Sequence, residues 1–364
     1  MVDMDKLFCF LLAGGEGTRL KPLTAKESKA MVNICSSFHL IDFALSNCYL
    51  SDIKNLGVIT QYSPETLIDY LIDWKSLINS NIRILPPKSS EGYQNVKYYD
   101  TAHSVFVNRD IIEDDDYEDI LIVHCDHVYN ADYKKLYEKH LESDADLTIG
   151  VYEVPIEEAS RFGILTVNDD GKVIDFEEKP ENPKSNLISM GIYIYKKEVL
   201  MKVLKLFDEL QHENISFSKD VVPDFVKNHN VNTVKFDKYW KDVGTIEALW
   251  EINMNALDEG KNYFELFNYK NTKILTKKIE LQPSVMKSAT FEQSFCGFNN
   301  NINGVIEHSV LGNNIVIEEG AHIINSVIFD SCIIKKGVTV KNAMISEGNI
   351  VEKDFGDDDK VSSL

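Results

Sequence analysis

The sequence predicts an α/β protein in two parts, a mostly parallel sheet with flanking helices followed by a parallel β-helix. Two observations predict this fold class. In the first 257 residues, short apolar runs alternate with segments of helical periodicity, and toward the C-terminus small or branched side chains recur every six residues. A glycine-rich turn directly after the first apolar run marks the edge of the sheet at which a ligand is expected.

The first part is expected to contain a sheet that is covered on both faces. Its apolar runs are short enough for single strands, and the segments between them repeat apolar side chains with a helical period. The expected strands are residues 7–12, 56–60, 120–123 and 147–151, and the clearest helices are residues 64–72 and 133–141. Ligands of such sheets bind at the carboxyl ends of the strands, where the turn at Gly14 and the carboxylate of Asp126 both fall.

The second part follows an irregular linker. We assign residues 1–257 to the first domain, 258–284 to the linker and 285–364 to a β-helix domain with an acidic tail. The six-residue period predicts coils in which each position stacks on its counterpart one coil further on, and loose β-structure is the alternative. The positions that define the period are Ile315, Ala321, Val327, Ile333, Thr339, Ile345 and Val351.

Composition excludes several classes of protein. The chain has 364 residues, of which 44% are hydrophobic, and its net charge of −20 repels nucleic-acid phosphates and anionic membranes. The first residues lack a basic signal-peptide region, and the apolar run over residues 7–13 is too short for a membrane span. Six cysteines without a C-x-x-C pair are typical of free thiols in a reducing compartment. We therefore expect a soluble cytoplasmic protein that binds neither nucleic acid nor membranes.

The turn after the first strand has the composition of a phosphate-binding loop. Gly14, Gly15 and Gly17 let backbone N–H groups approach a polyphosphate closely, and Arg19 and Lys29 supply cationic donors to its oxygens. The spacing matches neither G-x-G-x-x-G nor the Walker pattern that ends in G-K-[ST]. The turn therefore predicts an anion site that is neither of the dinucleotide type nor of the P-loop type.

With these residues in view, the chain resembles the sugar-phosphate nucleotidyltransferases, and most of all the bacterial glucose-1-phosphate adenylyltransferases, also called ADP-glucose pyrophosphorylases. The string GGEGTRL at residues 14–20 carries the resemblance first, and further matches follow in the order of the family over nearly the whole chain. They are LIDFALSN at 40–47, ITQY at 59–62, DHVY at 126–129, RFGI at 161–164, EKP at 178–180, SMGIY at 189–193 and YWKDVGT at 239–245. The resemblance implies a nucleotidyltransferase-type sheet domain and a left-handed form of the β-helix.

The resemblance also implies the reaction, in which the phosphate of glucose 1-phosphate attacks the α-phosphorus of ATP and expels pyrophosphate, for the synthesis of glycogen or another storage glucan. Both reactants are anionic, so the protein contributes positioning and charge neutralisation. By resemblance, Arg19, Lys29 and Asp126 are the catalytic residues, and Asp126 and Asp242 hold Mg²⁺, which prefers hard oxygen ligands. A zinc site at His124, Cys125 and His127 is disfavoured because successive strand side chains point to opposite faces, so these histidines are interpreted as structural or supporting residues.

The substrate contacts implied by the family fall into two sets. Pro180 is expected to push Lys179 into an extended conformation, in which the ammonium meets a sugar phosphate and Glu178 accepts hydrogen bonds from hydroxyls. Gln61 matches a position that reads the adenine edge, where a side-chain amide offers a donor and an acceptor. The nucleotide set is Leu12, Ala13, Gly14, Gly15, Gln61, Thr101 and Ala102, and the sugar-phosphate set is Gly163, Glu178, Lys179 and Ser189.

Several positions depart from the family pattern, and they cluster around the expected ATP site. Glu16 stands where a basic residue is usual, Ala30 replaces a proline, His39 an arginine, Lys97 a tryptophan and Asp100 a glycine. A carboxylate about 4 Å from a phosphate charge costs roughly 4 kcal/mol at an effective dielectric near 20, but only about 1 kcal/mol in water. The effect of Glu16 on ATP therefore depends on whether its side chain points into the site or into solvent.

Three hypotheses compete at this point. The first is an active ADP-glucose-forming enzyme, and the second is a weakly active or inactive regulatory subunit that pairs with a catalytic paralogue. The third, an acyltransferase at the β-helix, ranks last because His308 and His322 occupy ordinary turn or face positions. The family also implies tetramers and sugar-phosphate effectors, and Lys26 matches an effector position while Glu27 replaces a basic residue. The expected partners are thus ATP, glucose 1-phosphate, a sugar-phosphate effector and either identical subunits or a paralogue.

Overall fold

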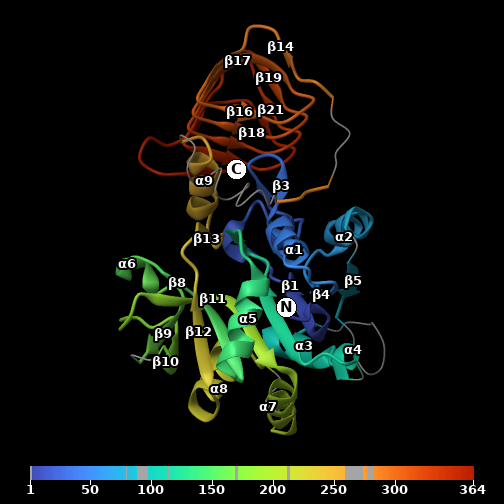
Figure 1. Cartoon of the computed structure of the whole chain (residues 1–364). Coiled ribbons are helices and arrows are strands. Elements are labelled where there is room, and N and C mark those ends of the chain that lie inside the picture. Colours follow the sequence, from blue (N-terminus) through green and yellow to red (C-terminus); the bar gives the residue numbers. More distant parts are fainter. Residues whose placement is uncertain are drawn as a thin grey trace.

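The computed structural model describes residues 2–78, 80–87, 97–113, 115–168, 171–210, 214–258, 274–277 and 282–364. The chain forms an α/β part and a β-helix, and helix α9 (Ile246–Asn255) lies where the two meet (Figure 1). Most of the predicted linker, residues 259–273 and 278–281, lies outside the described residues. Among the described residues, no helix combines the length and apolar character that a membrane crossing requires.

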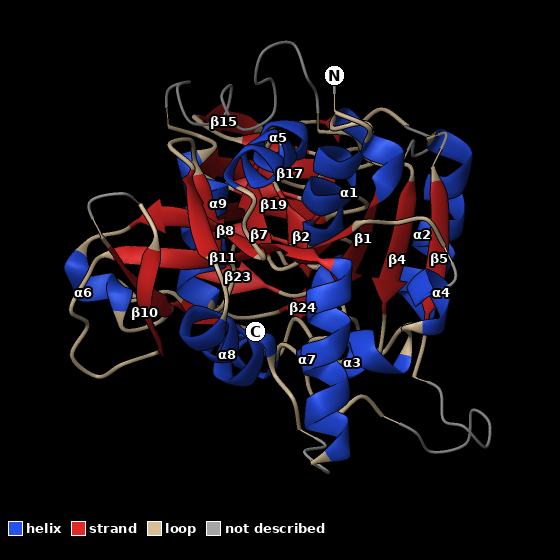
Figure 2. Cartoon of the chain, turned by 60° about the horizontal axis from the view of Figure 1, so that its bottom comes forward, coloured by secondary structure: helices blue, strands red, loops and turns tan. Residues whose placement is uncertain are grey.

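The α/β part is built on a nine-stranded sheet whose main path runs β10-β9-β11-β6-β1-β4-β5, with β8 beside β11 and β12 beside β8. Strands β6, β1, β4 and β5 are parallel, and β11 runs antiparallel to β6 and β8. Figure 2 shows β1, β4 and β5 side by side. The strands are β1 (Leu7–Leu12), β4 (Asn55–Ile59), β5 (Asn81–Leu85), β6 (Asp119–His124), β8 (Leu147–Glu153), β9 (Gly163–Val167), β10 (Val173–Glu178), β11 (Leu187–Lys196) and β12 (Val231–Lys235).

Helices cover both faces of this sheet, as the alternating pattern predicts. Along β1, Cys9 faces a core shared with α1, α2 and α5, whereas Phe8 and Phe10 face a core shared with α3, α4, α7 and α8. The helices are α1 (Leu40–Leu50), α2 (Glu65–Leu77), α3 (Thr101–Val107), α4 (Asp110–Glu113), α5 (Tyr133–Ser143), α6 (Ile156–Ala159), α7 (Lys197–Glu209) and α8 (Val222–Asn228). Short helical turns are η1 (Met4–Lys6), η2 (Thr18–Leu20), η3 (Lys29–Met31) and the π-type η4 (Phe217–Val221).

Helix α1 carries a fully buried carboxylate. Asp42 accepts hydrogen bonds from the Tyr70 hydroxyl at 2.6 Å, from Trp74 Nε1 at 2.9 Å and from the backbone N–H of His39 at 2.9 Å. Burial raises the pKa of Asp42, although the neighbouring donors and His39 oppose that shift. Through these bonds the carboxylate connects the start of α1 to α2. Asp42 therefore has a structural role that explains why a charged residue lies in the core.

Parallel strands make up the C-terminal β-helix. They are β14 (Val285–Met286), β15 (Thr290–Glu292), β16 (Phe295–Cys296), β17 (Asn301–Glu307), β18 (Val310–Leu311), β19 (Val316–Ile324), β20 (Val327–Ile328), β21 (Ile333–Ile334), β22 (Thr339–Lys341), β23 (Ala343–Ile345), β24 (Ile350–Val351), β25 (Phe355–Gly356) and β26 (Ser362–Ser363). This confirms the predicted fold class, a mostly parallel sheet with flanking helices followed by a parallel β-helix.

One detail of the repeat prediction is wrong, because the central coils are one residue shorter than three hexapeptides. Val310 pairs with Val327 and Val327 with Met344, which are seventeen residues apart in each case. Ile333 therefore pairs with Val316 and is only half-buried, whereas a strict six-residue period would stack it on Ile315. The phase of the apolar positions slips by one residue in each of these central coils.

Asparagine-rich corners hold the coils together. Asn325 and Asn342 both have a positive φ, and Asn325 Nδ2 donates to Asn342 Oδ1 at 2.5 Å. The predicted acidic tail is not free: Asp358 pairs with Lys341 at 2.5 Å, and Ser362 then aligns with Ala343 in the last coil. Residues of the predicted acidic tail are thus part of the β-helix.

The β-helix packs on the α/β part through one of its sheets. Val310, Val327 and Met344 share a buried core with Val243 and with Leu249 of α9. Polar contacts also cross the boundary, since Asn313 Nδ2 donates to the Ser36 carbonyl at 3.2 Å and Trp250 Nε1 donates to the Asn325 carbonyl at 3.0 Å. The apolar core fixes the β-helix against the segment that follows the glycine turn.

Candidate active site

A cavity of about 350 Å³ opens at the carboxyl ends of β6, β1 and β4, which are neighbours in the sheet. Most of the predicted nucleotide set lines it, namely Leu12, Ala13, Gly14, Gly15, Gln61 and Thr101, together with Lys29 and Asp126. Ala102 differs from the prediction, because it lies on the buried face of α3 and does not line the cavity. The topology thus brings the glycine turn and Asp126 to one crevice, as expected for parallel strands.

Backbone geometry explains the glycines of the turn. A Cβ on Gly14 would lie 3.3 Å from the Cβ of Gln61, so the β1 and β4 ends approach closely there. Gly17 has a φ of +65°, and a Cβ on it would lie 3.1 Å from the Cβ of Lys29. The turn therefore folds back on η3 and carries Lys29 into the cavity.

Lys29 and Asp126 form the central ion pair of the cavity. Lys29 Nζ donates to Asp126 Oδ2 at 2.7 Å, and the Lys29 side chain is only 11% exposed. Burial would raise the pKa of Asp126, but the charge of Lys29 outweighs it, together with His127 and His124, and holds that pKa well below its usual range. Asp126 is therefore ionised at neutral pH, and Lys29 is fixed in a position from which it can meet a phosphate.

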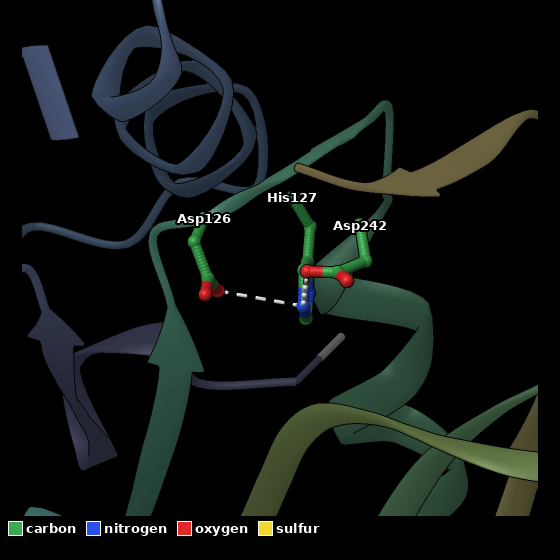
Figure 3. A group of neighbouring side chains, drawn as sticks. All are labelled: Asp126, His127 and Asp242. Atoms are coloured by element: carbon green, nitrogen blue, oxygen red, sulfur yellow. Dashed lines mark ion pairs between the residues drawn. The ribbon is translucent and has the colours of Figure 1, made fainter. Parts of the chain in front are cut away.

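Asp126, His127 and Asp242 bring one ligand atom each within 4.8 Å of one another (Figure 3). Strand β7 (His127–Tyr129) pairs antiparallel with β13 (Trp240–Asp242), and this register places Asp242 opposite His127. The His127 Nε2 atom lies 3.4 Å from Asp126 Oδ1 and 3.8 Å from Asp242 Oδ1. Among the described residues no donor gives a hydrogen bond to the buried Asp126 Oδ1. The carboxylates of Asp126 and Asp242 offer hard oxygen ligands, and these suit a divalent cation such as Mg²⁺.

Sequence reasoning assigned His127 no place in the metal site. Strand alternation was used against a zinc site at His124, Cys125 and His127, but β6 ends at His124 and β7 begins at His127, so the chain turns between them. The rings of His124 and His127 stack at 6.4 Å, and His127 joins the carboxylate pair. The adjacency of His127 to Asp126 in the sequence was the only available signal.

Two arginines approach Asp242. Arg161 Nη2 lies 3.5 Å from Asp242 Oδ2, a contact that the sequence reasoning did not assign. Arg19 is exposed and does not line the cavity, but its Nη2 atom would lie 3.4 Å from a Cβ on Gly244, next to Asp242. Arg19 forms no ion pair with any of the described residues, so its guanidinium is available to an incoming anion.

The predicted sugar-phosphate residues gather on the neighbouring strands. Glu178 aligns with Gly163 between β10 and β9, and Lys179 Nζ lies 3.4 Å from Glu178 Oε1. Ser189 Oγ donates to the Tyr193 hydroxyl at 3.0 Å. Burial lowers the pKa of His124, which lines the cavity, and the nearby charge of Lys179 adds to this effect.

The expected backbone of Lys179 is wrong. Its φ is +49°, a left-handed conformation, where the following Pro180 had predicted an extended one. Its N–H donates to the Phe162 carbonyl at 3.0 Å, and this bond holds the residue where strand β10 ends. Tertiary hydrogen bonding therefore overrides the local preference that proline imposes.

His124 lies under the site in a tightly packed environment. A Cβ on Gly191, whose φ is +67°, would lie 3.0 Å from the ring of His124. Burial lowers the pKa of His124 to about 4, so the imidazole is neutral at pH 7. The glycine of the SMGIY segment is therefore needed for the close approach of β11 to the end of β6.

The departures from the family pattern have different structural consequences. Glu16 does not line the cavity; its side chain is 44% exposed and pairs with Lys21 at 3.5 Å. Ala30, Lys97 and Asp100 line the cavity, so these three change its wall. His39 lies outside it and begins α1 instead, with Nδ1 2.7 Å from the Met31 carbonyl.

The fold and the site together define a nucleotidyltransferase, and comparison with known proteins agrees. Residues 9–259 match the family model described as "Nucleotidyl transferase", and residues 282–359 match "GlmU-like, C-terminal hexapeptide". The chain is 37% identical over 334 residues to a glucose-1-phosphate adenylyltransferase of Bacillus mycoides (strain KBAB4), an alignment that covers 90% of this chain and 88% of the relative. It is 40% identical over 315 residues to one of Clostridium novyi (strain NT), covering 84% and 81% respectively. The chain belongs to the glucose-1-phosphate adenylyltransferase family.

Proposed function

We propose that this protein forms ADP-glucose and pyrophosphate from ATP and glucose 1-phosphate, for the synthesis of glycogen or another storage glucan. The observation that carries the proposal is the convergence of Lys29, Asp126 and Asp242 beside a cavity lined by the glycine turn. This set supplies a fixed cation for a phosphate and two carboxylates for a divalent metal. Membership of the family gives the choice of reaction and of substrates.

The chain's residues contribute mainly position and charge. The N–H groups around Gly14 and Gly15 and the ammonium of Lys29 hold the triphosphate. The guanidinium of Arg19 stabilises the negative charge that develops on the leaving pyrophosphate. Lys179 and Glu178 hold the hexose phosphate so that its oxygen faces the α-phosphorus. Asp126 and Asp242 would hold Mg²⁺, which when bound neutralises phosphate charge.

We also propose a cytoplasmic enzyme that works as an oligomer, a tetramer by family resemblance. The six cysteines are all free thiols, which suits a reducing compartment. Control by a sugar-phosphate effector is expected to be weak or absent, because Glu27 stands beside Lys26 where the family has a basic residue. Light scattering of the purified protein and titration with sugar phosphates test these two points.

The departures around ATP do not block the cavity, and nothing in the structure or among the relatives favours an inactive regulatory subunit. The decisive experiment measures pyrophosphate release from glucose 1-phosphate and Mg²⁺ with ATP, UTP, dTTP or GTP. We expect release with ATP above all, loss of release in Asp242→Asn, and wild-type release in Asp237→Asn, which changes an exposed carboxylate on the same segment. Absence of release with ATP, or full activity of Asp242→Asn, would contradict the proposal.

A further inference from the structure

The order of strands sets a direction for a nucleotide in the cavity. Asp126 follows β6, the glycine turn follows β1, and Gln61 follows β4, and these three strands are adjacent in that order. Neighbouring strands lie about 4.8 Å apart, so the end of β4 is roughly 10 Å from the end of β6. If phosphates bind over β6 and β1, the base lies over β4, where Gln61, Tyr98 and Asp100 line the wall.

The protein already uses one of the two acceptor positions of the Gln61 amide. Its Oε1 atom accepts the backbone N–H of Tyr98 at 2.5 Å. This bond fixes the amide orientation and occupies one lone pair of Oε1, while both N–H groups of Nε2 remain for a ligand. Gln61 is therefore better prepared to donate to a ring nitrogen of adenine than to accept from its amino group, and a second acceptor in the cavity wall would complement it.

Asp100 provides an acceptor at this place. Its Oδ1 atom accepts the N–H of Thr101 at 2.6 Å, as the N-cap of α3. Its second oxygen accepts no hydrogen bond from the described residues, and no lysine, arginine or histidine among them pairs with the carboxylate. A carboxylate is purely an acceptor when ionised, so it attracts N–H groups and repels carbonyl oxygens.

We propose that Asp100 is a specificity-determining residue that accepts a hydrogen bond from the exocyclic amino group of adenine, while Gln61 Nε2 donates to the neighbouring ring nitrogen. The inference rests on the proposed function in that it places ATP in this cavity. A carboxylate oxygen that accepts and an amide N–H that donates have the hydrogen-bonding polarity that the amino group and the adjacent ring nitrogen of adenine require. Hypoxanthine presents a carbonyl oxygen and a ring N–H at the same two positions, and both pairings are then reversed.

The test compares the binding of ATP and ITP by calorimetry, with Mg²⁺ and without glucose 1-phosphate. The wild type is expected to bind ATP at least about tenfold more tightly than ITP, which corresponds to ~1.4 kcal/mol. In Asp100→Asn, whose amide also donates and still caps α3, the ratio is expected to fall below about threefold. Asp100→Gly, which removes the oxygens at a position where glycine is tolerated, is expected to lower the ratio as well.

Asp132→Asn is the matched control. Asp132 is the exposed N-cap of α5, with Oδ1 accepting the N–H of Lys135 at 3.2 Å, and it lies outside the cavity. It removes the same charge and should keep the wild-type ratio. A wild type without discrimination, or Asp100 variants that keep its ratio, would overturn the inference.

The two proposals fail in different ways. Preferential ATP binding that depends on Asp100, combined with no pyrophosphate release, would leave the specificity inference standing and reject the proposed function. Pyrophosphate release with an unchanged ATP-to-ITP ratio in the variants would do the reverse. Failure to bind either nucleotide would reject both.

Discussion

Substitution of Glu16 tests whether its carboxylate lies close to the phosphates of bound ATP. A carboxylate about 4 Å from a phosphate charge inside the cavity would cost roughly 4 kcal/mol, which is almost three decades in affinity. The structure instead turns Glu16 outward, 44% exposed and 3.5 Å from Lys21, which is itself 53% exposed. At physiological salt such exposed charges are screened over about 8 Å.

We therefore expect Glu16→Gln to change the KM for ATP by less than about fivefold, which corresponds to ~1 kcal/mol. The assay is pyrophosphate release at saturating glucose 1-phosphate and physiological ionic strength. Lys21→Met is the matched control, because it breaks the same exposed pair from the other side. A drop of a hundredfold or more in the KM of Glu16→Gln would mean that the carboxylate faces the phosphates, and the outward orientation would be refuted.

Three further predictions follow from buried contacts. Asp42→Ala removes the acceptor of Trp74 Nε1, of the His39 N–H and of the Tyr70 hydroxyl, of which, among the described residues, only Tyr70 keeps a second partner, Thr276. At about 1–3 kcal/mol for each unsatisfied donor, chemical denaturation should show a loss of roughly 2–5 kcal/mol, and a loss below ~1 kcal/mol would contradict the buried network. Gly191→Ala meets the ring of His124 at a positive φ, and its melting temperature should fall by several degrees; an unchanged value would contradict the close approach. Lys29→Met should lower the rate of pyrophosphate release at least about hundredfold. The pKa of Asp126 is depressed when folded, so its pairing with Lys29 stabilises the protein fully above the unfolded value of about 3.9 and loses that effect as the pH falls toward the folded value. The stability gap between wild type and Lys29→Met should accordingly be larger at pH 7 than at pH 3, and an equal gap would refute the pairing.

Local patterns predicted the elements of the α/β part well. The apolar run 7–12 is β1 without change, and the run 120–123 grew by one residue at each end into Asp119–His124. These segments are buried on both faces of the sheet, so their hydrophobicity alone identifies them. The end of β1 also fixed the place of the glycine turn, because topology brings the carboxyl ends of parallel strands to one edge.

The sequence could not reveal features that depend on distant contacts. The left-handed backbone of Lys179 depends on the Phe162 carbonyl, and the pairing of Arg161 with Asp242 joins residues 81 positions apart. Whether Glu16 faced ATP depended on a side-chain direction that no local pattern encodes. The coil length of the β-helix was misjudged for a different reason. The central coils have seventeen residues in place of eighteen, and a difference of one residue per coil is hard to see in a repeat of only a few coils.

The most direct measurement of the central claim is a crystal structure with Mn²⁺, glucose 1-phosphate and a non-hydrolysable ATP analogue, with anomalous scattering used to locate the metal. An anomalous peak between Asp126 and Asp242, with the triphosphate over Gly14 and Gly15 and the base beside Gln61, is the predicted result. No peak at the two carboxylates, or a triphosphate bound elsewhere, would contradict a nucleotidyl-transfer site in this crevice.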